Sequence, residues 1–392
     1  MIKRVFYSSG PGNIIESHQC WKRNEHNPTE VSITFSTQVQ DFCRDINATA
    51  YFVSTHPNKA TLTDGAFTLE HRPKPARTGA LFHIGEILYG LGLLRTALRF
   101  RAHVALIDSG CTHYFVLVLF RACGIRVIPV LHNTLWPSGF PPVKTIPRMV
   151  LQLDSLFLRR IPTALIGVAP ECERQVDQVR GKKRYPIFLT TAQFEPQYFA
   201  KIPPPPHERR PFQVMYVGRI DRIKGVFDIL EIASKLELTH PGLVRWEICG
   251  RGKDFDELSA RHRELKLDGV VNLRGWTSLD DLVGVYAKSH VSIVPTRSVF
   301  REGLAMTAVE AILAGRPVVT NPVVPALEVL RSACAAAKTD DVESHLQAVL
   351  ELATNAEVYE RARAACVGYQ YRFYDRSYGL TAVLKKALAA FI

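Results

Sequence analysis

The second half of the chain contains a series of short apolar segments, and each ends in a turn rich in glycine or arginine. Four of them are Phe212–Val217, Arg245–Cys249, Val270–Leu273 and Val291–Pro295, and a helical stretch such as Val226–Leu236 follows. Strands and helices that alternate in this way form a parallel sheet, and all the turns leave from the carboxyl edge of its strands. We therefore predict an α/β fold whose turns converge on one nucleotide. Further elements are predicted as strand Pro317–Asn321 and helices Leu279–Ala287, Val342–Thr354, Ala356–Val367 and Gly379–Ile392.

The stretch after the fourth strand carries two glutamates with seven residues between them. Glu302 precedes a glycine, and Glu310 lies in a short helix that we expect to start near Leu304 and to stop at Gly315. The free amides of the first turn of such a helix form an anion site. The stretch is therefore suited to a sugar nucleotide, with phosphate on the amides, sugar hydroxyls on one acid and ribose hydroxyls on the other.

The turn after the first of these strands begins with Gly218 and carries two cations, Arg219 and Lys224. Two cations at a strand-to-helix turn suit a diphosphate, since arginine offers a planar fork of donors and lysine a point charge. The turn is not a P-loop, because the glycine spacing and the following Ser or Thr are missing. The next two turns bring Gly250 and Thr277 to the same edge.

The N-terminal half also reads as alternating strands and helices. Gly10 and Gly12 follow the first strand, where glycines either let the backbone approach a ligand or simply make a tight turn. His132 directly follows another strand, so it is placed either to reach a ligand or to bond to a neighbouring loop. The predicted strands are Ile2–Tyr7, Val31–Ser36, Ala50–Ser54, Val104–Asp108, Val127–Leu131 and Leu165–Ala169.

The 392 residues are too many for one ordinary core, so two domains are expected. Four consecutive prolines cannot form a helix or a central strand, and they mark a stiff spacer. We therefore predict an N-terminal domain over 1–200, a Pro-rich linker over 201–211 and a nucleotide-sugar-binding domain over 212–375. The last segment, 376–392, is predicted to be a helix.

The net charge of +12 is concentrated in the N-terminal half. Residues 1–200 hold 23 Lys and Arg against 14 Asp and Glu, whereas residues 201–392 hold 26 against 23. The basic half could face nucleic acid, an anionic membrane or an anionic substrate, or it could be an ordinary solvated surface. Two regions stand out: the helical stretch 81–103 with its arginines, and 143–184 with the cluster Lys182-Lys183-Arg184.

Hydropathy and cysteine usage limit the class of protein. No uninterrupted apolar run reaches the roughly 18–20 residues of a membrane span, and the best candidate, 114–130, is broken by Arg121 and Arg126. The eight cysteines are scattered without a Cys-x-x-Cys pair, which argues against a disulfide framework or a zinc site. These features favour a cytoplasmic protein, with the inner face of the membrane as a peripheral location.

Together, these residues resemble the donor half of family 4 retaining glycosyltransferases, the glycosyl transferases group 1. The resemblance rests on Gly218-Arg219 with Lys224-Gly225, Gly250-x-Gly252, Leu273-x-Gly275-Trp276, and Glu302 to Glu310 followed by Gly315-x-Pro317. It is good over 212–335, weaker over 125–180, and present only in outline before residue 120. It implies the GT-B fold, with two Rossmann-like domains that face a central cleft. It also implies that the helix in 376–392 crosses back to the N-terminal domain.

The resemblance also implies roles for single residues. Arg219 and Lys224 would bind the diphosphate, Glu302 the sugar hydroxyls and Glu310 the ribose. The remaining donor contacts would come from Gly10, Gly12, Gly218, Gly250, Thr277, Gly303, Leu304, Ala305 and Met306, and His132 would lie near the reaction centre. The sequence departs from the family in two places: Gly10-Pro11-Gly12 replaces a Gly-Gly pair, and 190–194 replaces an Asn-Gly-Val-Asp element.

The implied function is transfer of a sugar from a nucleotide sugar, UDP- or GDP-linked, to a glycan or lipid-linked acceptor hydroxyl. Such enzymes use neither a metal nor another cofactor. A nucleotide-sugar epimerase or a phosphorylase would keep the fold, but the extra acids of the one and the pyridoxal lysine of the other are not visible. A non-catalytic protein that binds anionic membranes or RNA is the third reading, which the glutamate pair disfavours because acids beside a phosphate site weaken nucleic-acid binding.

Overall fold

The structure is a computed structural model, and it describes residues 2–181 and 185–389. The chain divides into two compact units. The first contains Met1–Leu135, Pro142–Phe194 and Asp375–Ile392, and the second contains Trp136–Pro141 and Glu195–Tyr374. After the short segment Trp136–Pro141, the chain enters the second unit again at Glu195, just before helix α7 (Pro196–Ala200) and upstream of the predicted linker. The basic cluster at 182–184 lies outside the described residues.

The first unit is built on an eight-stranded sheet in the order β4-β5-β3-β1-β6-β7-β8-β9. All neighbouring strands are parallel except β4 and β5, which form an antiparallel hairpin at one edge. The order of the parallel strands reverses between β1 and β6, the place where open α/β sheets bind ligands. The strands are β1 (Arg4–Ser9), β3 (Thr49–Ser54), β4 (Ala60–Asp64), β5 (Phe67–His71), β6 (Val104–Asp108), β7 (Arg126–Leu131), β8 (Leu165–Gly167) and β9 (Ile187–Leu189).

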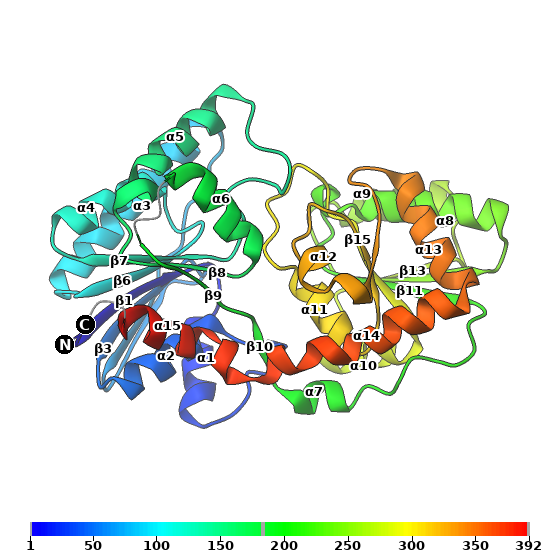
Figure 1. Cartoon of the computed structure of the whole chain (residues 1–392), viewed down its shortest axis with the longest axis horizontal. Helices are drawn as coiled ribbons and strands as arrows, with labels where there is room; N and C mark the ends of the chain where they lie inside the picture. The colour runs from blue at the N-terminus through cyan, green and yellow to red at the C-terminus, as the bar shows by residue number, and fades with distance from the viewer. Residues whose placement is uncertain (1, 182–184, 390–392) are drawn as a thin grey trace. The chain divides into compact units, whose positions relative to one another are not determined.

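Helices cover both faces of this sheet (Figure 1). One face carries α1 (Ile14–Lys22), α2 (Phe35–Asp45) and the last helix, α15 (Leu380–Ala389). The other carries α3 (Gly79–Arg99), the turn η1 (Tyr114–Val116), α4 (Leu117–Ala122), α5 (Thr145–Arg160) and α6 (Pro170–Arg180). Helix α15 is fixed to α2 because the Leu380 amide and the Thr381 hydroxyl both donate to Gln38, at 2.7 and 2.8 Å.

The second unit is built on a six-stranded, fully parallel sheet in the order β13-β12-β11-β14-β15-β16. This is the 3-2-1-4-5-6 order of a Rossmann sheet, with its reversal between β11 and β14. The predicted α/β class with parallel sheets is confirmed. The strands are β11 (Phe212–Val217), β12 (Val244–Cys249), β13 (Val271–Gly275), β14 (Val291–Val294), β15 (Val318–Thr320) and β16 (Cys334–Ala336).

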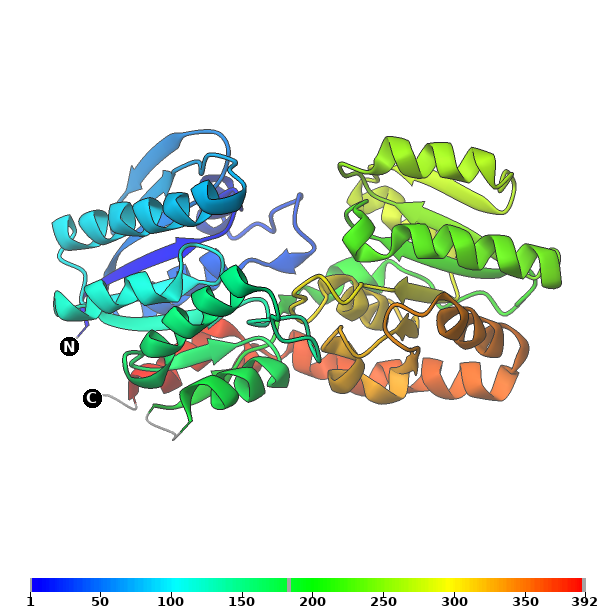
Figure 2. The same cartoon turned by 90° about the horizontal axis from the view of Figure 1, so that it is seen from above.

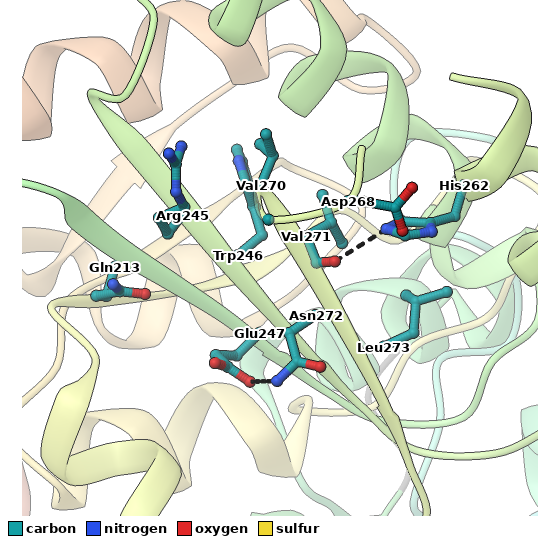
Figure 3. A pocket seen from close by; sticks show the side chains of 11 residues that line it. Gln213, Arg245, Trp246, Glu247, His262, Asp268, Val270, Val271, Asn272 and Leu273 are labelled. Carbon is teal, nitrogen blue, oxygen red and sulfur yellow. Dashed lines mark hydrogen bonds between the residues drawn. The ribbon is translucent and has the colours of Figure 1, made fainter. Parts of the chain in front are cut away.

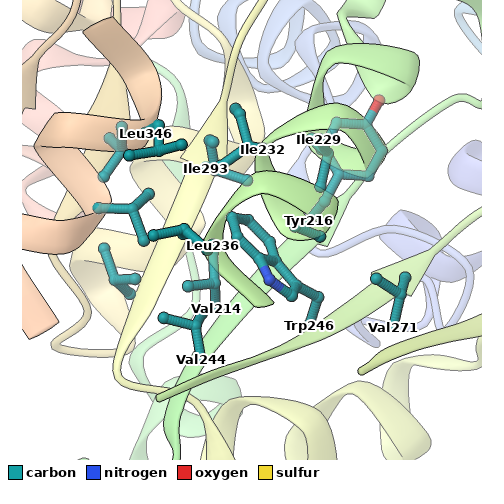
Figure 4. Close-up of a cluster of buried hydrophobic side chains, with 14 of the residues drawn as sticks. Val214, Tyr216, Ile229, Ile232, Leu236, Val244, Trp246, Val271, Ile293 and Leu346 are labelled. Carbon is teal, nitrogen blue, oxygen red and sulfur yellow. The ribbon is translucent and has the colours of Figure 1, made fainter. Parts of the chain in front are cut away.

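The helices of the second unit lie on both faces of its sheet (Figures 1 and 2). Helices α8 (Val226–Thr239), α9 (Phe255–Glu264) and α13 (Val342–Thr354) cover one face, and α10 (Leu279–Lys288), α11 (Met306–Leu313) and α14 (Ala356–Tyr374) the other. Trp246 of β12 is the largest fully buried side chain, and it packs among Val214, Ile232 and Leu236 (Figure 4). Shorter elements are η2 (Arg222–Lys224), α12 (Ala326–Val329) and η3 (Arg331–Ala333), with η4 (Arg376–Tyr378) in the first unit.

One predicted strand is wrong, and one predicted helix is longer than expected. Only β2 (Ser32–Ile33) of the predicted strand Val31–Ser36 is extended, and it pairs antiparallel with β10 (Gln193–Phe194). Helix α2 starts at Phe35 because the Thr34 hydroxyl accepts from the Thr37 amide and caps the helix. The predicted helix Ala356–Val367 continues to Tyr374, since one interior glycine costs a helix only about 1 kcal/mol.

Helix α3 was not predicted from the sequence as a candidate membrane span. This 21-residue helix is long and apolar enough to cross a membrane by length and composition, although such a helix alone is weak evidence of a span. Its sequence contains no long uninterrupted apolar run, because Glu86 and Arg95 lie within it.

Candidate active site

Glycine turns bring the backbone together at the carboxyl edge of the second sheet. The Gly250 amide donates to the Gly275 carbonyl, at 2.7 Å, and the Gly218 amide donates to the Cys249 carbonyl, at 3.0 Å. A Cβ atom on Gly250 would lie 1.8 Å from the Gly218 carbonyl oxygen, and Gly250 also has a positive φ of 140°. The fold itself therefore requires glycine at 250, whatever this turn contacts.

Two of the predicted site residues meet at the reversal point of this sheet. The Lys224 ammonium, in the turn after β11, donates to the Glu302 carboxylate at 2.6 Å. The hydroxyl of Thr296, just beyond β14, donates to the same oxygen at 2.9 Å. Glu302 is only 7% exposed. This buried carboxylate has both a cation and a neutral donor as partners, as a buried charge requires.

Arg219 lies next to this pair. Its guanidinium stands 5.8 Å from the centre of the Phe300 ring, and the Lys224 ammonium stands 4.0 Å from the same ring. The carbonyl of Arg219 accepts a hydrogen bond from the buried Tyr216 hydroxyl, at 2.9 Å, which fixes the turn. Both cations therefore lie within cation–π distance of the same ring, and together they gather positive charge at this turn.

The stretch from Gly303 to Met306 is buried or half-buried, and the helix in it begins later than predicted. Helix α11 starts at Met306 rather than near Leu304, because Ala305 takes a left-handed conformation with φ of 63°. That conformation is uncommon for a residue other than glycine, and it turns the chain sharply before the helix. The Ala308 amide donates to the Ala305 carbonyl. The amides of the first helical residues come before Ala308, and the helix itself offers such amides no acceptor.

Glu310 lies within α11 and is half-buried. Its charge affects Tyr198 of α7. The pKa of that phenol is raised to about 12, mainly by burial and secondly by the Glu310 carboxylate. The Tyr198 hydroxyl donates to the Leu279 carbonyl, at 3.1 Å. Thr277, the predicted contact of the base, follows β13, and its hydroxyl donates to the Gly275 carbonyl at 3.2 Å.

The first unit holds His132 at the end of β7, close to its own reversal point. His132 Nε2 lies 3.0 Å from Asp108 Oδ2, and the Tyr7 hydroxyl donates to the same oxygen at 2.7 Å. Burial lowers the pKa of His132, but the Asp108 carboxylate raises it by more, so the net shift is upward. Phe35 packs edge-on against the imidazole, with ring centres 4.6 Å apart.

Gly10 and Gly12 follow β1 in the same unit. A Cβ atom on either would meet no atom within 4 Å. The Gly10 carbonyl accepts from the Thr55 amide at 3.1 Å, and the Gly12 carbonyl accepts from the Ile14 amide at 3.0 Å. Packing within the unit therefore gives no reason for glycine at either position, which leaves their predicted contact with a donor as a separate expectation.

Sequence reasoning missed the residues that support the predicted ones. The Thr296 hydroxyl donates to Glu302, the Phe300 ring lies near both cations, and Asp108 raises the pKa of His132. The positions of Thr296 and Asp108 at the carboxyl ends of β14 and β6 were a usable signal, because polar side chains there point to the ligand edge of the sheet. No sequence signal marked Phe300, which lies in an irregular loop.

An open pocket of about 530 Å³ lies elsewhere in the second unit, against β12 and β13 (Figure 3). Its lining includes Gln213, His262 and Asn272; His262 Nε2 lies 2.9 Å from the Val271 carbonyl, and the Asn272 amide donates to Glu247. Gln213 is near the start of β11, so the pocket is nearer the amino ends of the strands than the glycine turns are. It is not the predicted donor site, and none of the predicted site residues lines it.

Comparison with known proteins gives a family for part of the chain. A family model described as Glycosyl transferases group 1 matches residues 199–366. The glycogen synthase of Mycobacterium tuberculosis H37Rv is 29% identical over 111 residues, which are 28% of this chain and 26% of that protein. The lipopolysaccharide 1,6-galactosyltransferase of Salmonella typhimurium LT2 is 32% identical over 125 residues, 31% of this chain and 33% of that protein. The matches thus span about a quarter to a third of these relatives.

Solved structures match over the whole chain. Sucrose-phosphate synthase from Thermosynechococcus elongatus superposes with a TM-score of 0.72 at 12% identity, covering 99% of this chain and 98% of that one. Anabaena HepE, in a complex with UDP, superposes with a TM-score of 0.68 at 14% identity, covering 100% of both chains. At such low identity these likenesses establish the fold. Residues 199–366 are therefore similar to the glycosyl transferases group 1, and the chain has the GT-B fold.

Proposed function

We propose that the chain is a retaining, metal-independent glycosyltransferase that moves a sugar from a nucleotide sugar to a hydroxyl of a glycan or a lipid-linked acceptor. The observation that carries the proposal is the Lys224–Glu302 pair at the reversal point of the second sheet, with Arg219 beside it. This arrangement offers positive charge for a diphosphate and a buried carboxylate for sugar hydroxyls within one site. The family match of this segment supports the same reading.

In the proposed reaction, the bond between the anomeric carbon and the diphosphate oxygen breaks as the acceptor oxygen bonds to that carbon. Arg219 and Lys224 stabilise the negative charge that develops on the departing diphosphate, with the amides around Ala305 as further donors. The acceptor hydroxyl attacks from the face that the diphosphate leaves, and its proton passes to the diphosphate. The configuration of the sugar is then retained without a covalent enzyme intermediate.

The other assignments follow the same geometry. Glu302 holds the sugar hydroxyls, Glu310 the ribose, and the backbone near Thr277 the base. His132, whose pKa is raised by Asp108, supplies a hydrogen-bond donor in the first unit. The two cations make a metal ion unnecessary for neutralising the diphosphate. UDP or GDP is the proposed nucleotide, and the UDP complex of Anabaena HepE supports the first.

The test is release of nucleoside diphosphate from a panel of UDP- and GDP-sugars, with EDTA present and with a mixture of glycan and lipid-linked acceptors. We expect release with one donor series, and an NMR spectrum of the product that shows the anomeric configuration of the donor. Lys224→Ala should slow release by about a hundredfold to a thousandfold, whereas Lys235→Ala, a partly exposed lysine on α8, should leave it unchanged. Inversion of configuration or a requirement for a metal would overturn those parts of the proposal. No release from any donor would favour an epimerase or a binding protein.

A further inference from the structure

Helix α3 turns an apolar stripe outward, away from the core of the first unit. Leu81, Ile84, Leu88 and Leu91 are all exposed, Leu88 by 58%. Their spacing of three and four residues places them along one side of the helix. The opposite side is the buried one, and it contains Glu86, Gly90, Leu93 and Ala97. A surface helix of a globular protein normally has the reverse arrangement, with its polar side outward.

Helix α5 repeats this arrangement. Ile146, Met149, Leu153 and Leu156 are exposed at the same spacing, Leu156 by 59%, and the buried residues of the helix include Phe157. The two helices lie on the same face of the sheet (Figure 1), and η1 contacts both of them. We call the outward sides of α3 and α5 the apolar face. Exposed apolar patches on this scale mark interaction sites.

The charge around the apolar face has one sign. Residues 72–170 contain twelve Lys and Arg and three acids. The three acids, Glu86, Asp108 and Asp154, are only 8, 4 and 9% exposed, so they contribute little to the surface. The exposed cations lie on or next to the two helices and α4: Arg95, Arg99, Arg101, Arg121, Lys144, Arg148, Arg159 and Arg160. A surface of exposed leucines ringed by arginines complements a bilayer with anionic headgroups.

We propose that the apolar face docks on an anionic lipid bilayer, with α3 and α5 lying in the plane of the interface. A second copy of the chain is a poorer occupant, because pairing two such faces would bring the same ring of cations together. Nucleic acid is a poorer occupant as well, because aliphatic side chains offer no stacking surface to bases.

Contacts on the inner side of α3 keep it in the interface rather than across the membrane. The buried Glu86 carboxylate accepts from the Lys74 ammonium at 2.8 Å, and the Glu86 carbonyl accepts from the Thr112 hydroxyl at 2.8 Å. A Cβ atom on Gly90 would lie 2.3 Å from the Thr112 oxygen, so the helix lies very close to the fold beneath it. Leaving this position would expose Glu86 to lipid, which is costly for a charged group.

This inference stands apart from the proposed function, since docking needs no donor and no transfer. Taken with that function, it favours the lipid-linked class of acceptor, because such an acceptor is held at the bilayer surface. The docking test is therefore run without nucleotide sugar, so its failure would leave the transferase proposal in place, and the reverse also holds.

The test is sedimentation of the full chain with vesicles of pure phosphatidylcholine and of an equimolar mixture of phosphatidylcholine and phosphatidylglycerol. We expect binding to the mixed vesicles, and weaker binding as salt screens the arginines. The double variant Leu88→Gln with Leu156→Gln should bind the mixed vesicles roughly tenfold more weakly. The matched control is Leu238→Gln on α8 of the second unit, also highly exposed, and it should bind like the wild type.

Because all three substituted leucines are exposed, the variants should keep the thermal midpoint of the wild type, which confirms that they fold. Equal binding to both vesicle types, or wild-type binding by the double variant, would overturn the proposal. So would resistance to extraction by alkaline carbonate, which would mean that α3 spans the bilayer. A dimer in solution that the double variant loses would instead assign the apolar face to a second copy.

Discussion

The Lys224 ammonium lies 2.6 Å from the Glu302 carboxylate, although 78 residues separate the two positions in the chain. Each neutralises the other in a site where Glu302 has almost no access to water. A diphosphate would compete for the lysine, and the carboxylate would then be free to accept hydrogen bonds from a sugar. In the proposed function, the pair would therefore couple binding of the diphosphate to binding of the sugar.

The first prediction concerns this pair. Lys224→Ala should lower kcat/KM by about a hundredfold to a thousandfold, because the transition-state charge on the diphosphate loses a preorganised cation. It should also lower the free energy of unfolding by about 1–3 kcal/mol, since the buried Glu302 carboxylate loses its ion pair with the lysine. Glu302→Gln should lower activity comparably but cost less stability. Urea unfolding of both single variants and the double variant measures the coupling, and additive effects on stability would contradict the account.

The second prediction concerns Thr296. Thr296→Val keeps the shape of the side chain but removes the hydroxyl that donates to Glu302 at 2.9 Å. We expect a loss of about 1.5–3 kcal/mol in the free energy of unfolding, as for a hydrogen bond to a charged group, together with a lower kcat/KM. Thr296→Ser retains a hydroxyl and serves as the matched control. If the valine variant matched the wild type in both stability and activity, Thr296 would have no part in holding Glu302.

The third prediction compares two glycines that sequence reasoning had treated alike. Gly250→Ala should destabilise the protein by about 3 kcal/mol, because the new Cβ atom meets the Gly218 carbonyl oxygen and the φ of 140° excludes it. Gly12→Ala should cost less than about 0.5 kcal/mol, since the new Cβ atom meets nothing within 4 Å. Thermal and urea unfolding measure both values. Equal costs would show that the close approach of the two turns is not what requires glycine.

The fourth prediction concerns the pH dependence that Asp108 imposes on His132. The folded pKa of His132 is raised above its usual value of 6.5, so the pair adds stability that is fully present below about pH 6.5. This contribution is lost as the pH rises through the raised pKa. Asp108→Asn should lower the pKa of His132, and its deficit in unfolding free energy should shrink with rising pH over this range. NMR titration of the His132 imidazole gives the pKa directly, and an unchanged value in the variant would rule out the pairing.

The ligand edge of the sheet can be predicted from the sequence much better in the second unit than in the first. Strands such as Phe212–Val217 are short, apolar and closed by glycine, so both their limits and their common edge can be predicted. The late start of α11 could not be, because the left-handed Ala305 is fixed by tertiary contacts rather than by residue type. Nor could the capping of α2 by Thr34, which competed with a strand pattern at Val31–Ser36.

Long-range pairings were the least predictable part of the candidate site. The sequence presents Lys224, Glu302 and His132 as separate residues, and only the fold brings in Thr296 and Asp108 as their partners. In the first unit, the outward leucines of α3 recur at helical spacing. This spacing would be the same if the leucines faced a core or a membrane. Burial alone distinguishes the two, and it comes from tertiary structure.

The most direct test of the donor site is thermal unfolding with EDTA and saturating UDP-, GDP-, ADP- or TDP-sugars. A ligand that binds only the native state at a hundred times its Kd adds about 2.7 kcal/mol of stability. We predict a raised midpoint with one nucleotide series. The rise should be lost in Arg219→Ala and kept in Arg245→Ala, whose side chain lines the pocket against β12 and β13. No shift with any donor, or a shift lost in Arg245→Ala and kept in Arg219→Ala, would contradict the assignment of the donor site to the carboxyl edge of the sheet.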